Sequence, residues 1–335
     1  MAEKILKVVN KPFVVGDLEY ILSVSIGVAL FPHDSMDRDE LLKRSDIAMY
    51  QAKQEGKNRY RLYSNTLDRN IKKYYTIENI LKRALNKKGF YLLYQPQIEL
   101  ASGRITVLEV LLRIREDIAG DIIMPEEFIP VSEKSDLINK IGKWVFRACC
   151  KQLREWKDVD KLNNIVLSIN ISKRYLIDDK WIVFVKNTIR QYQISADRIE
   201  FEITEEALNS SKEKGQKIIS QLQEIGFRIS IDDFGTGYSS LGVLKVLDIN
   251  RLKIDKSFID GVSTNDDDKA IVKASIALGE AFGISTVAEG VETNEQKRIV
   301  TELGCREMQG FLYSVPRGAK EIVALLKSDP ASSHF

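Results

Sequence analysis

Eight short β-rich runs recur at regular intervals from residue 90 onward, and this recurrence restricts the fold of the 335-residue chain more than any other feature. From the third run on, a stretch with helical periodicity separates each run from the next, which predicts an α/β fold, a (β/α)8 barrel. The turn LASGRI between the first two runs is too short for a helix, so these two strands should pair antiparallel. The runs lie at 90–96, 105–112, 164–170, 198–203, 226–231, 249–254, 284–288 and 305–311.

The segment before the barrel has its own pattern. Residues 12–32 contain two β-rich runs joined through Gly16 and Asp17, which predicts a hairpin. A helix should follow from a cap at Asp37 to a stop at Gly56, and the stretch RYRLYS should form a short strand. We therefore expect a small α+β fragment over 1–64, a linker helix over 65–89 and the barrel domain over 90–328.

Charge, cysteine content and hydropathy exclude several classes of protein. With 50 basic and 48 acidic residues the net charge is only +2, which argues against a nucleic acid polymer as partner. The three cysteines cannot build a disulfide framework or a zinc site, which fits a reducing cytoplasm. Since no run approaches the roughly 18–20 apolar residues of a membrane span, we expect a cytoplasmic protein, although a longer parent could be membrane-tethered.

Polar residues recur where the predicted strands end. In such a barrel the βα loops all gather at the carboxyl ends of the strands, so these side chains should meet at one mouth. A lone glutamate at a strand end is more often a solvated or capping residue, and an asparagine there is more often part of a turn. The recurrence on nearly every strand is what favours a site; its members are Glu109, Asn170, Glu202, Asp232, Asp233, Lys253, Glu289 and Gln309.

The residue types at this mouth favour hard divalent cations. Mg²⁺ and Mn²⁺ prefer oxygen ligands, whereas zinc would call for histidine or cysteine, and the two histidines, His33 and His334, lie outside the barrel runs. An aspartate shared by two ions is a feature of sites that hydrolyse phosphate esters. We expect both ions to share Asp232. Asp233 and Glu289 should complete the coordination of one ion, and Glu109, Asn170 and Glu202 should bind the other. Lys253 should orient the water or offset the crowded carboxylates.

Two glycines follow the paired aspartates in DDFGTGYSS. A lone G-x-G is weak evidence for dinucleotide binding, because the third glycine of that fingerprint is missing. We interpret the glycines as a tight, mobile loop, with Ser239 or Ser240 capping the next helix.

Nine motifs in order give the chain from about residue 75 to 328 a specific resemblance to the EAL domain, the family of cyclic di-GMP phosphodiesterases. The signature stands here as EVLLR at 109–113, with Val110 in place of the usual alanine; on a strand Val110 should point away from the face of Glu109. The other motifs are YQPQI at 94–98, EEFIPVSE at 126–133, SINIS at 168–172, EITEE at 202–206, DDFGTGYSSL at 232–241, LKIDKSFI at 252–259, AEGVET at 288–293 and MQGF at 308–311.

The resemblance implies a TIM-like barrel with one antiparallel strand, a site with two Mg²⁺ or Mn²⁺ ions, and hydrolysis of cyclic di-GMP to linear pGpG. Carried over by position, it gives Lys253, Glu289 and Glu205 catalytic roles, Glu205 by steadying the loop after Asp233, and it implies a homodimer through that loop. It places Gln95, Arg113, Glu292 and Gln309 near the substrate. The implied metal ligands are Glu109, Asn170, Glu202, Asp232, Asp233 and Glu289.

Residues 20–62 resemble the C-terminal part of a GGDEF domain, through VSIGVALFP and LLKRSDIAMYQAKQEGKNRY. The cyclase signature and the nucleotide-binding half of that domain are missing, so we expect no synthesis of cyclic di-GMP. The fragment is either the edge of a cut piece or a natural truncation that serves as a spacer, and a sensor domain further upstream stays open.

Two other functions compete with the enzyme. A degenerate EAL domain could act as a cyclic di-GMP receptor with weak catalysis, and a protein-interaction module could use the metal site as a scaffold. Degeneration usually removes a metal ligand, and none is lost here, which favours the phosphodiesterase.

Overall fold

The computed structural model describes residues 1–159, 161–237 and 241–328. Contacts between residues divide the chain into two units, one of Met1–Arg83 with Pro130–Ser132 and one of Ala84–Ile129 with Glu133–Phe335. The predicted boundaries at 64, 89 and 328 stay a prediction.

The N-terminal unit contains the predicted hairpin, helix and strand. Strands β1 (Phe13–Val15) and β2 (Leu18–Tyr20) pair antiparallel across Gly16 and Asp17, and the positive φ of Gly16 (63°) suits so tight a turn. Helix α2 (Arg38–Gln54) begins where the Asp37 side chain accepts a hydrogen bond from the backbone nitrogen of Glu40. The remaining elements are α1 (Ala2–Val9), the parallel pair β3 (Ile26–Val28) and β4 (Tyr60–Leu62), and α3 (Asn65–Asn86).

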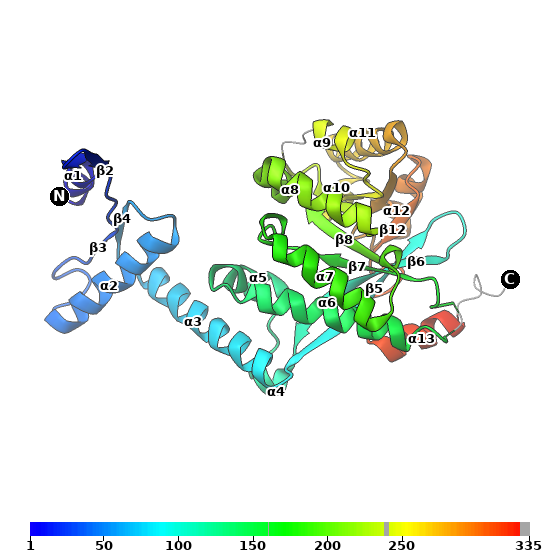
Figure 1. The fold of residues 1–335 in the computed structure, drawn as a ribbon, viewed down its shortest axis with the longest axis horizontal. Coiled ribbons are helices and arrows are strands. Elements are labelled where there is room, and N and C mark those ends of the chain that lie inside the picture. The colour runs from blue at the N-terminus through cyan, green and yellow to red at the C-terminus, as the bar shows by residue number, and fades with distance from the viewer. Residues whose placement is uncertain (160, 238–240, 329–335) are drawn as a thin grey trace. The chain divides into compact units, whose positions relative to one another are not determined.

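The second unit is a closed barrel of eight strands, as predicted (Figure 1). Strand β5 runs antiparallel to both of its neighbours, β6 and β12, while the other adjacent pairs are parallel. The single antiparallel strand is therefore confirmed. The strands are β5 (Phe90–Glu99), β6 (Ile105–Ile114), β7 (Val166–Asn170), β8 (Ile199–Thr204), β9 (Arg228–Phe234), β10 (Arg251–Ile254), β11 (Ser285–Ala288) and β12 (Glu307–Gln309).

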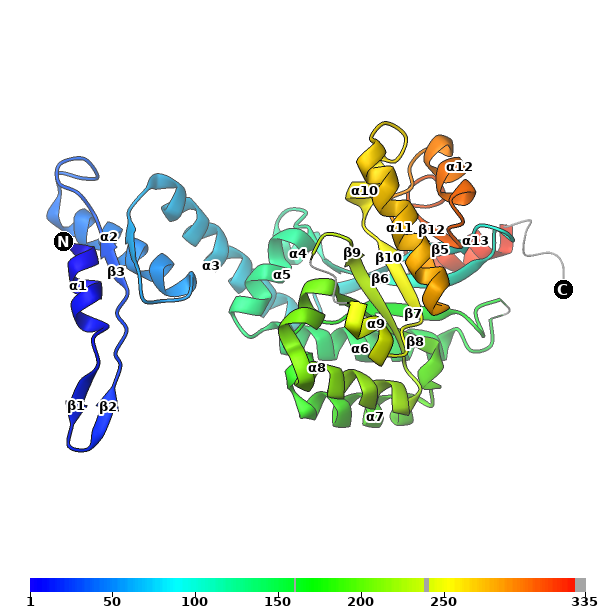
Figure 2. The ribbon, with the colours of Figure 1, turned by 90° about the horizontal axis from the view of Figure 1, so that it is seen from above.

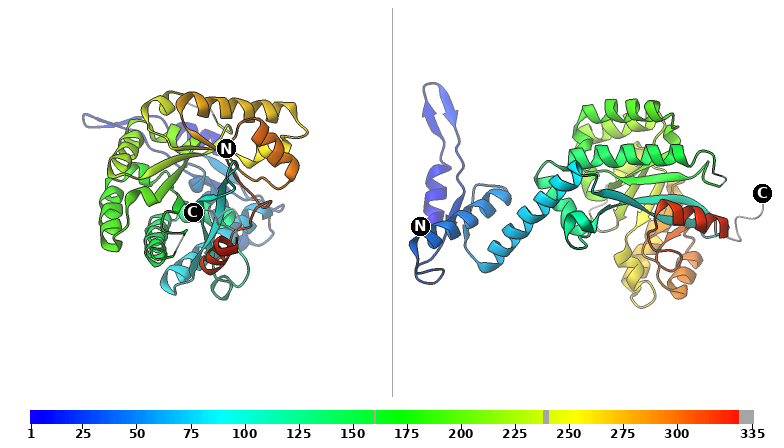
Figure 3. Two further views of the ribbon diagram at one scale, coloured as in Figure 1. Left: turned by 90° about the vertical axis from the view of Figure 1, so that its right-hand side faces the viewer. Right: turned by 90° about the horizontal axis from the view of Figure 1, so that it is seen from below.

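Helices cover the outside of the barrel. Figures 2 and 3 show α7 and α8 side by side along one flank and α11 beside β10 and β11, in agreement with the contacts between these elements. Between helices and strands lies an aromatic core in which the rings of Phe146 and Phe201 stack at 5.8 Å. The helices are α4 (Glu116–Ala119), α5 (Pro125–Lys134), α6 (Ile138–Glu155), α7 (Asp179–Tyr192), α8 (Glu205–Ile225), α9 (Leu241–Val246), α10 (Lys256–Gly261), α11 (Asp266–Phe282), α12 (Asn294–Glu302) and α13 (Ala319–Ser328).

The inner face of the barrel is polar. Side chains alternate along a strand, so the apolar positions of β8, such as Phe201, pack against helices while Glu200 and Glu202 are buried among the inner positions. The same alternation places Arg251 and Lys253 on the inner face of β10. Instead of the usual branched apolar layers, this barrel carries two layers of hydrogen-bonding groups.

All three cysteines are buried, and none forms a disulfide. Among the described residues, no helix combines the length and the apolar character that crossing a membrane would require.

Candidate metal centre

Asp232 and Asp233 project their carboxylates to the same side of the barrel, although neighbours on a regular strand point to opposite faces. The pairing of β9 with β10 explains this. Ile231 lies opposite Leu252 and Phe234 lies opposite Ile254, so two residues of β9 face one residue of β10. Asp233 occupies the extra position, with a left-handed φ of 54°. A β-bulge therefore gathers both acids at one mouth.

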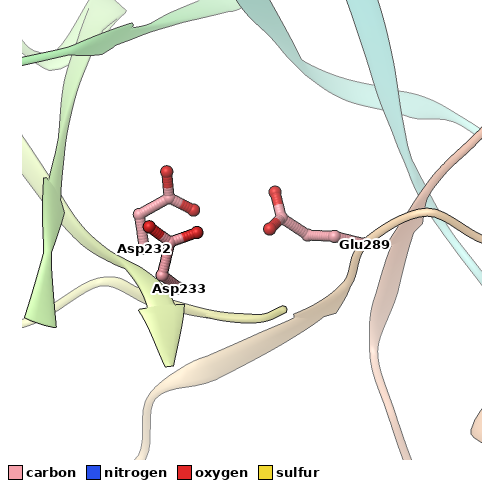
Figure 4. Close-up of side chains that lie close together, drawn as sticks. All are labelled: Asp232, Asp233 and Glu289. Carbon is pink, nitrogen blue, oxygen red and sulfur yellow. The ribbon is translucent and has the colours of Figure 1, made fainter. Parts of the chain in front are cut away.

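Glu289 approaches the two aspartates from the end of β11. Figure 4 shows its carboxylate directed toward those of Asp232 and Asp233 across the mouth of the barrel. One oxygen of each residue lies within 4.8 Å of the others. This spacing is close enough for a single ion to contact all three carboxylates.

Lys253 is buried below these acids, with a relative exposure of only 1%. Its Nζ lies 2.8 Å from Glu202 Oε2, 3.0 Å from Asp232 Oδ1 and 2.8 Å from Glu289 Oε1. Carboxylates from β8, from β9 and from the end of β11 therefore surround this ammonium. Such complete burial requires this degree of charge compensation.

Glu109 and Asn170 form the other side of the mouth. Asn170 Nδ2 donates to Glu109 Oε1 at 3.0 Å, and Gln309 Nε2 donates to Glu109 Oε2 at 2.5 Å. Val110 is buried on the opposite face and lines a cavity of about 420 Å³ together with Ile141 and Phe201. Val110 thus points away from Glu109, as predicted.

Burial and mutual repulsion favour protonation of Glu202, Asp233 and Glu289. Burial, assisted by repulsion from Glu109 and Asp232, raises the pKa of Glu202 to about 8. Burial and the neighbouring Asp232 raise the pKa of Asp233 to about 6. The pKa of Glu289 is raised for the same two reasons, burial first, even though Lys253 opposes the shift. Burial alone would lower the pKa of Lys253, but the surrounding carboxylates outweigh it and raise that pKa well above its usual value.

The other predicted site residues are more dispersed. Gln95 is buried and accepts from Gln309 Nε2 at 3.1 Å. Arg113 is half-buried and donates to the Leu112 carbonyl, and Glu292 is exposed with Lys256 Nζ 2.5 Å from its carboxylate. Glu205 accepts from the backbone nitrogen of Gly235 at 3.2 Å, in the loop after Asp233. The cap predicted at Ser239 or Ser240, and the mobility of that loop, lie outside the described residues.

A second polar layer below the mouth was missed by the sequence analysis. It contains Gln97, Ser168, Glu200, Arg251 and Glu307, all buried. Each lies two positions from a mouth residue on the same strand: Gln97 from Gln95, Glu200 from Glu202 and Arg251 from Lys253. The period of two was therefore a signal that could have found this layer.

The residues of the mouth fit a divalent cation. Their side chains offer carboxylate and amide oxygens, which are the donors that Mg²⁺ and Mn²⁺ prefer. Asp232 Oδ1 is buried and lacks a hydrogen-bond partner, because Lys253 lies near it without the alignment of a hydrogen bond. A cation would complete the coordination of that oxygen.

A barrel with one antiparallel strand and an acidic mouth agrees with the family comparison. The family model "EAL domain" matches residues 78–316, and the model "Diguanylate cyclase, GGDEF domain" matches residues 1–59. The chain belongs to the EAL domain family, with a GGDEF fragment at its N-terminus.

Similar proteins include signalling proteins, and one of them is named for cyclic di-GMP turnover. The chain is 39% identical to Signaling protein YkoW of Bacillus subtilis over 99% of this chain and 41% of that protein. It is 37% identical to the bifunctional diguanylate cyclase/cyclic di-GMP phosphodiesterase MucR of Pseudomonas aeruginosa, over 97% of this chain and 47% of MucR. The solved PaMucR phosphodiesterase in complex with c-di-GMP superposes with a TM-score of 0.70 at 36% identity, over 73% of this chain and 99% of that one. The chain spans about half the length of the curated relatives it matches.

Proposed function

We propose that this chain is a metal-dependent phosphodiesterase that hydrolyses cyclic di-GMP to linear pGpG. The observation that carries the proposal is the convergence of five carboxylates from the ends of four strands at one mouth, where three of them contact the buried ammonium of Lys253. The named activity of MucR and the solved complex of its phosphodiesterase with c-di-GMP support this choice of substrate.

Charge supports a pair of ions. Five ionised carboxylates against one ammonium leave four negative charges, which two divalent cations would neutralise. We assign Glu109, Asn170 and Glu202 to one ion and Asp233 and Glu289 to the other, with Asp232 shared between them. Bound Mg²⁺ or Mn²⁺ would lower the pKa of a water molecule and offset charge on the phosphate.

The protein side chains have separate roles in this mechanism. The positive charge of Lys253 offsets the electrostatic repulsion among the carboxylates of Glu202, Asp232 and Glu289. All three can therefore lie close together in the mouth. The Lys253 ammonium also lies where it can donate to an attacking water beside Asp232. Gln95, Gln309, Arg113 and Glu292 are assigned to the substrate, where amide and guanidinium groups suit phosphate and guanine edges.

The test is incubation of the full chain with cyclic di-GMP and Mg²⁺, followed by chromatographic separation of the nucleotides. Linear pGpG should accumulate. Glu109→Ala should lower turnover by at least about 100-fold, more than the 10–100-fold typical of losing a residue that only supports a ligand. The matched control is Val110→Ala, one residue away on the opposite face, which should stay within about twofold of the unaltered chain.

Two outcomes would count against this proposal, the first against the assigned metal ligand Glu109 and the second against the enzyme. Undiminished hydrolysis by Glu109→Ala would remove Glu109 from the metal centre. Binding of cyclic di-GMP without any pGpG would favour the receptor that was the alternative from sequence.

We also infer a homodimer through the loop that follows Asp233. Residues 238–240 of this loop lie outside the described part, so the support comes from the family resemblance and from the contact between Glu205 and Gly235 at its base. Light scattering after gel filtration should give a mass near twice the 38.2 kDa of the chain. A cytoplasmic location and an upstream sensor domain remain further proposals.

A further inference from the structure

A chain of side-chain hydrogen bonds crosses the barrel interior from Arg251 to Glu109. Arg251 Nη1 donates to Gln97 Oε1 at 2.6 Å, and Gln97 Nε2 donates to Gln309 Oε1 at 2.7 Å. Gln309 Nε2 then donates to Glu109 Oε2 at 2.5 Å. These hydrogen bonds thus link the lower polar layer to a carboxylate of the metal centre.

The chemistry of arginine determines which group donates and which accepts in each of these hydrogen bonds. A guanidinium has only donors, so the amide of Gln97 must present its oxygen to Arg251 and its NH₂ group to Gln309. Gln309 must in turn accept through its oxygen and donate through its nitrogen. Each amide therefore has one orientation, and the Gln309 amide nitrogen donates to Glu109 and also to Gln95.

Arg251, the first donor in this series of hydrogen bonds, is held in place by several contacts. Arg251 is paired with Glu307 through two hydrogen bonds, from Nε at 3.2 Å and from Nη2, and it lies 3.5 Å from Glu200 Oε1. Thr106 Oγ1 and Ser285 Oγ each donate to Glu307 at 2.7 Å. The guanidinium cannot turn away from Gln97 without breaking these contacts.

Gln97 lies within the motif YQPQI, but no role of its own was assigned to it from the sequence. It is fully buried, with a relative exposure of 0%, and lies directly across from Gln309 in the antiparallel pair of β5 and β12. A fully buried glutamine is costly unless both ends of its amide are bonded, and here both are. The two hydrogen bonds of its amide, and not packing alone, therefore explain a glutamine at this buried position.

We propose that Arg251 and Gln97 are positioning residues that orient Glu109 toward a metal ion by fixing the amide of Gln309. The proposal rests on the proposed function, because it requires Glu109 to be a metal ligand. Without Gln97, the Gln309 amide can reverse and present its oxygen to Glu109, which would displace the carboxylate.

The test compares Mn²⁺ affinity, followed by electron paramagnetic resonance of free Mn²⁺, between the full chain and its variants. Gln97→Met keeps an unbranched side chain of similar length but removes both hydrogen bonds, and should raise the Mn²⁺ dissociation constant about tenfold. Ser285→Ala is the matched control. It removes one hydrogen bond to Glu307 in the same layer and leaves the hydrogen bonds from Arg251 to Glu109 intact, so its dissociation constant should change less than about twofold.

Thermal unfolding without metal separates positioning from a merely structural role. A structural role would make both variants less stable while leaving Mn²⁺ affinity unchanged, and that result would overturn the proposal. If Gln97→Met does not fold, Gln97→Glu takes its place, since its carboxylate accepts from Arg251 but cannot donate to Gln309. Weaker Mn²⁺ binding despite the added negative charge would support the proposal, and equal or tighter binding would overturn it.

The failure of this proposal can be told from failure of the proposed function. An unaltered chain that binds no Mn²⁺ would overturn both, because no ion would then be available for Glu109. Normal Mn²⁺ binding by the unaltered chain and by the Gln97 variants alike would overturn only the positioning role.

Discussion

Lys253 Nζ lies 2.8 Å from Oε1 of Glu289, and the same ammonium contacts Glu202 and Asp232. A single buried cation thus stands among three acids that otherwise repel one another. This arrangement keeps the carboxylates close enough to share divalent ions.

Replacing Lys253 should destabilise the fold, because the three acids then repel one another without a compensating charge. We expect Lys253→Met to lower the free energy of unfolding of the metal-free protein by about 3–5 kcal/mol at pH 8, the usual loss when one partner of a buried ion pair is removed. Denaturant unfolding measures the change. The control is Lys151→Met, which breaks an exposed pair with Glu155 and should cost no more than about 1 kcal/mol. Equal losses in both variants would show that Lys253 does not compensate the acids.

The stability of the metal-free protein should fall as pH rises. A carboxyl group whose pKa is raised on folding binds its proton more tightly in the native state than in the unfolded state. For Glu202 the pKa rises from 4.5 to about 8, so its stabilising contribution is present below pH 4.5 and is lost as pH rises toward 8. Asp233, raised to about 6, adds the same sign over a lower range. Thermal unfolding of the metal-free chain at a series of pH values measures this dependence. The account would be wrong if the variant Glu202→Gln lost stability with pH as steeply as the unaltered chain.

Metal binding should follow the opposite trend. Because Mg²⁺ or Mn²⁺ must displace the protons held by these carboxyl groups, affinity should increase at least about tenfold between pH 6 and pH 8. Isothermal titration with Mn²⁺ at the two pH values measures it. A dissociation constant that is the same at both would mean that no protonated acid of this cluster takes part.

Calcium should inhibit hydrolysis. Ca²⁺ prefers longer bonds and more ligands than Mg²⁺, so it would occupy the mouth without the geometry suited to the reaction. Adding Ca²⁺ to the Mg²⁺-loaded protein should reduce pGpG formation, and excess Mg²⁺ should restore it. Full activity with Ca²⁺ as the sole divalent ion would contradict the assignment of the metal centre.

Glu205 should affect turnover more than substrate binding. Its Oε2 accepts from the backbone of Gly235, and an added Cβ at Gly237 would lie only 3.2 Å from its Oε1, so the carboxyl group is closely fitted to this loop. We expect Glu205→Ala to lower kcat with little change in the affinity for cyclic di-GMP, and Glu205→Gln, which keeps an acceptor, to retain most activity. Equal losses of turnover and of affinity in Glu205→Ala would argue for direct contact with the substrate.

Much of the fold followed from local signals. The eight strands were predicted from short β-rich runs, and the antiparallel strand from a turn too short for a helix, because both depend on neighbouring residues only. The mouth could be predicted as well, since the carboxyl ends of parallel strands must meet. These features require no knowledge of which side chains touch.

The parts that could not be predicted depend on long-range packing. The bulge at Asp233 is visible only in the register of β9 against β10. The three partners of Lys253 come from three other strands; the sequence predicted that this lysine offsets carboxylates, but not which three it contacts. The hydrogen bond from Gln97 to Gln309 joins residues 212 positions apart, which no local pattern encodes.

The most direct test of the account is anomalous diffraction from crystals of this chain soaked in Mn²⁺. We expect two peaks at the barrel mouth, both about 2.1 Å from oxygens of Asp232, with Glu109 beside one and Glu289 beside the other. An empty mouth, or manganese held elsewhere in the molecule, would contradict the central claim.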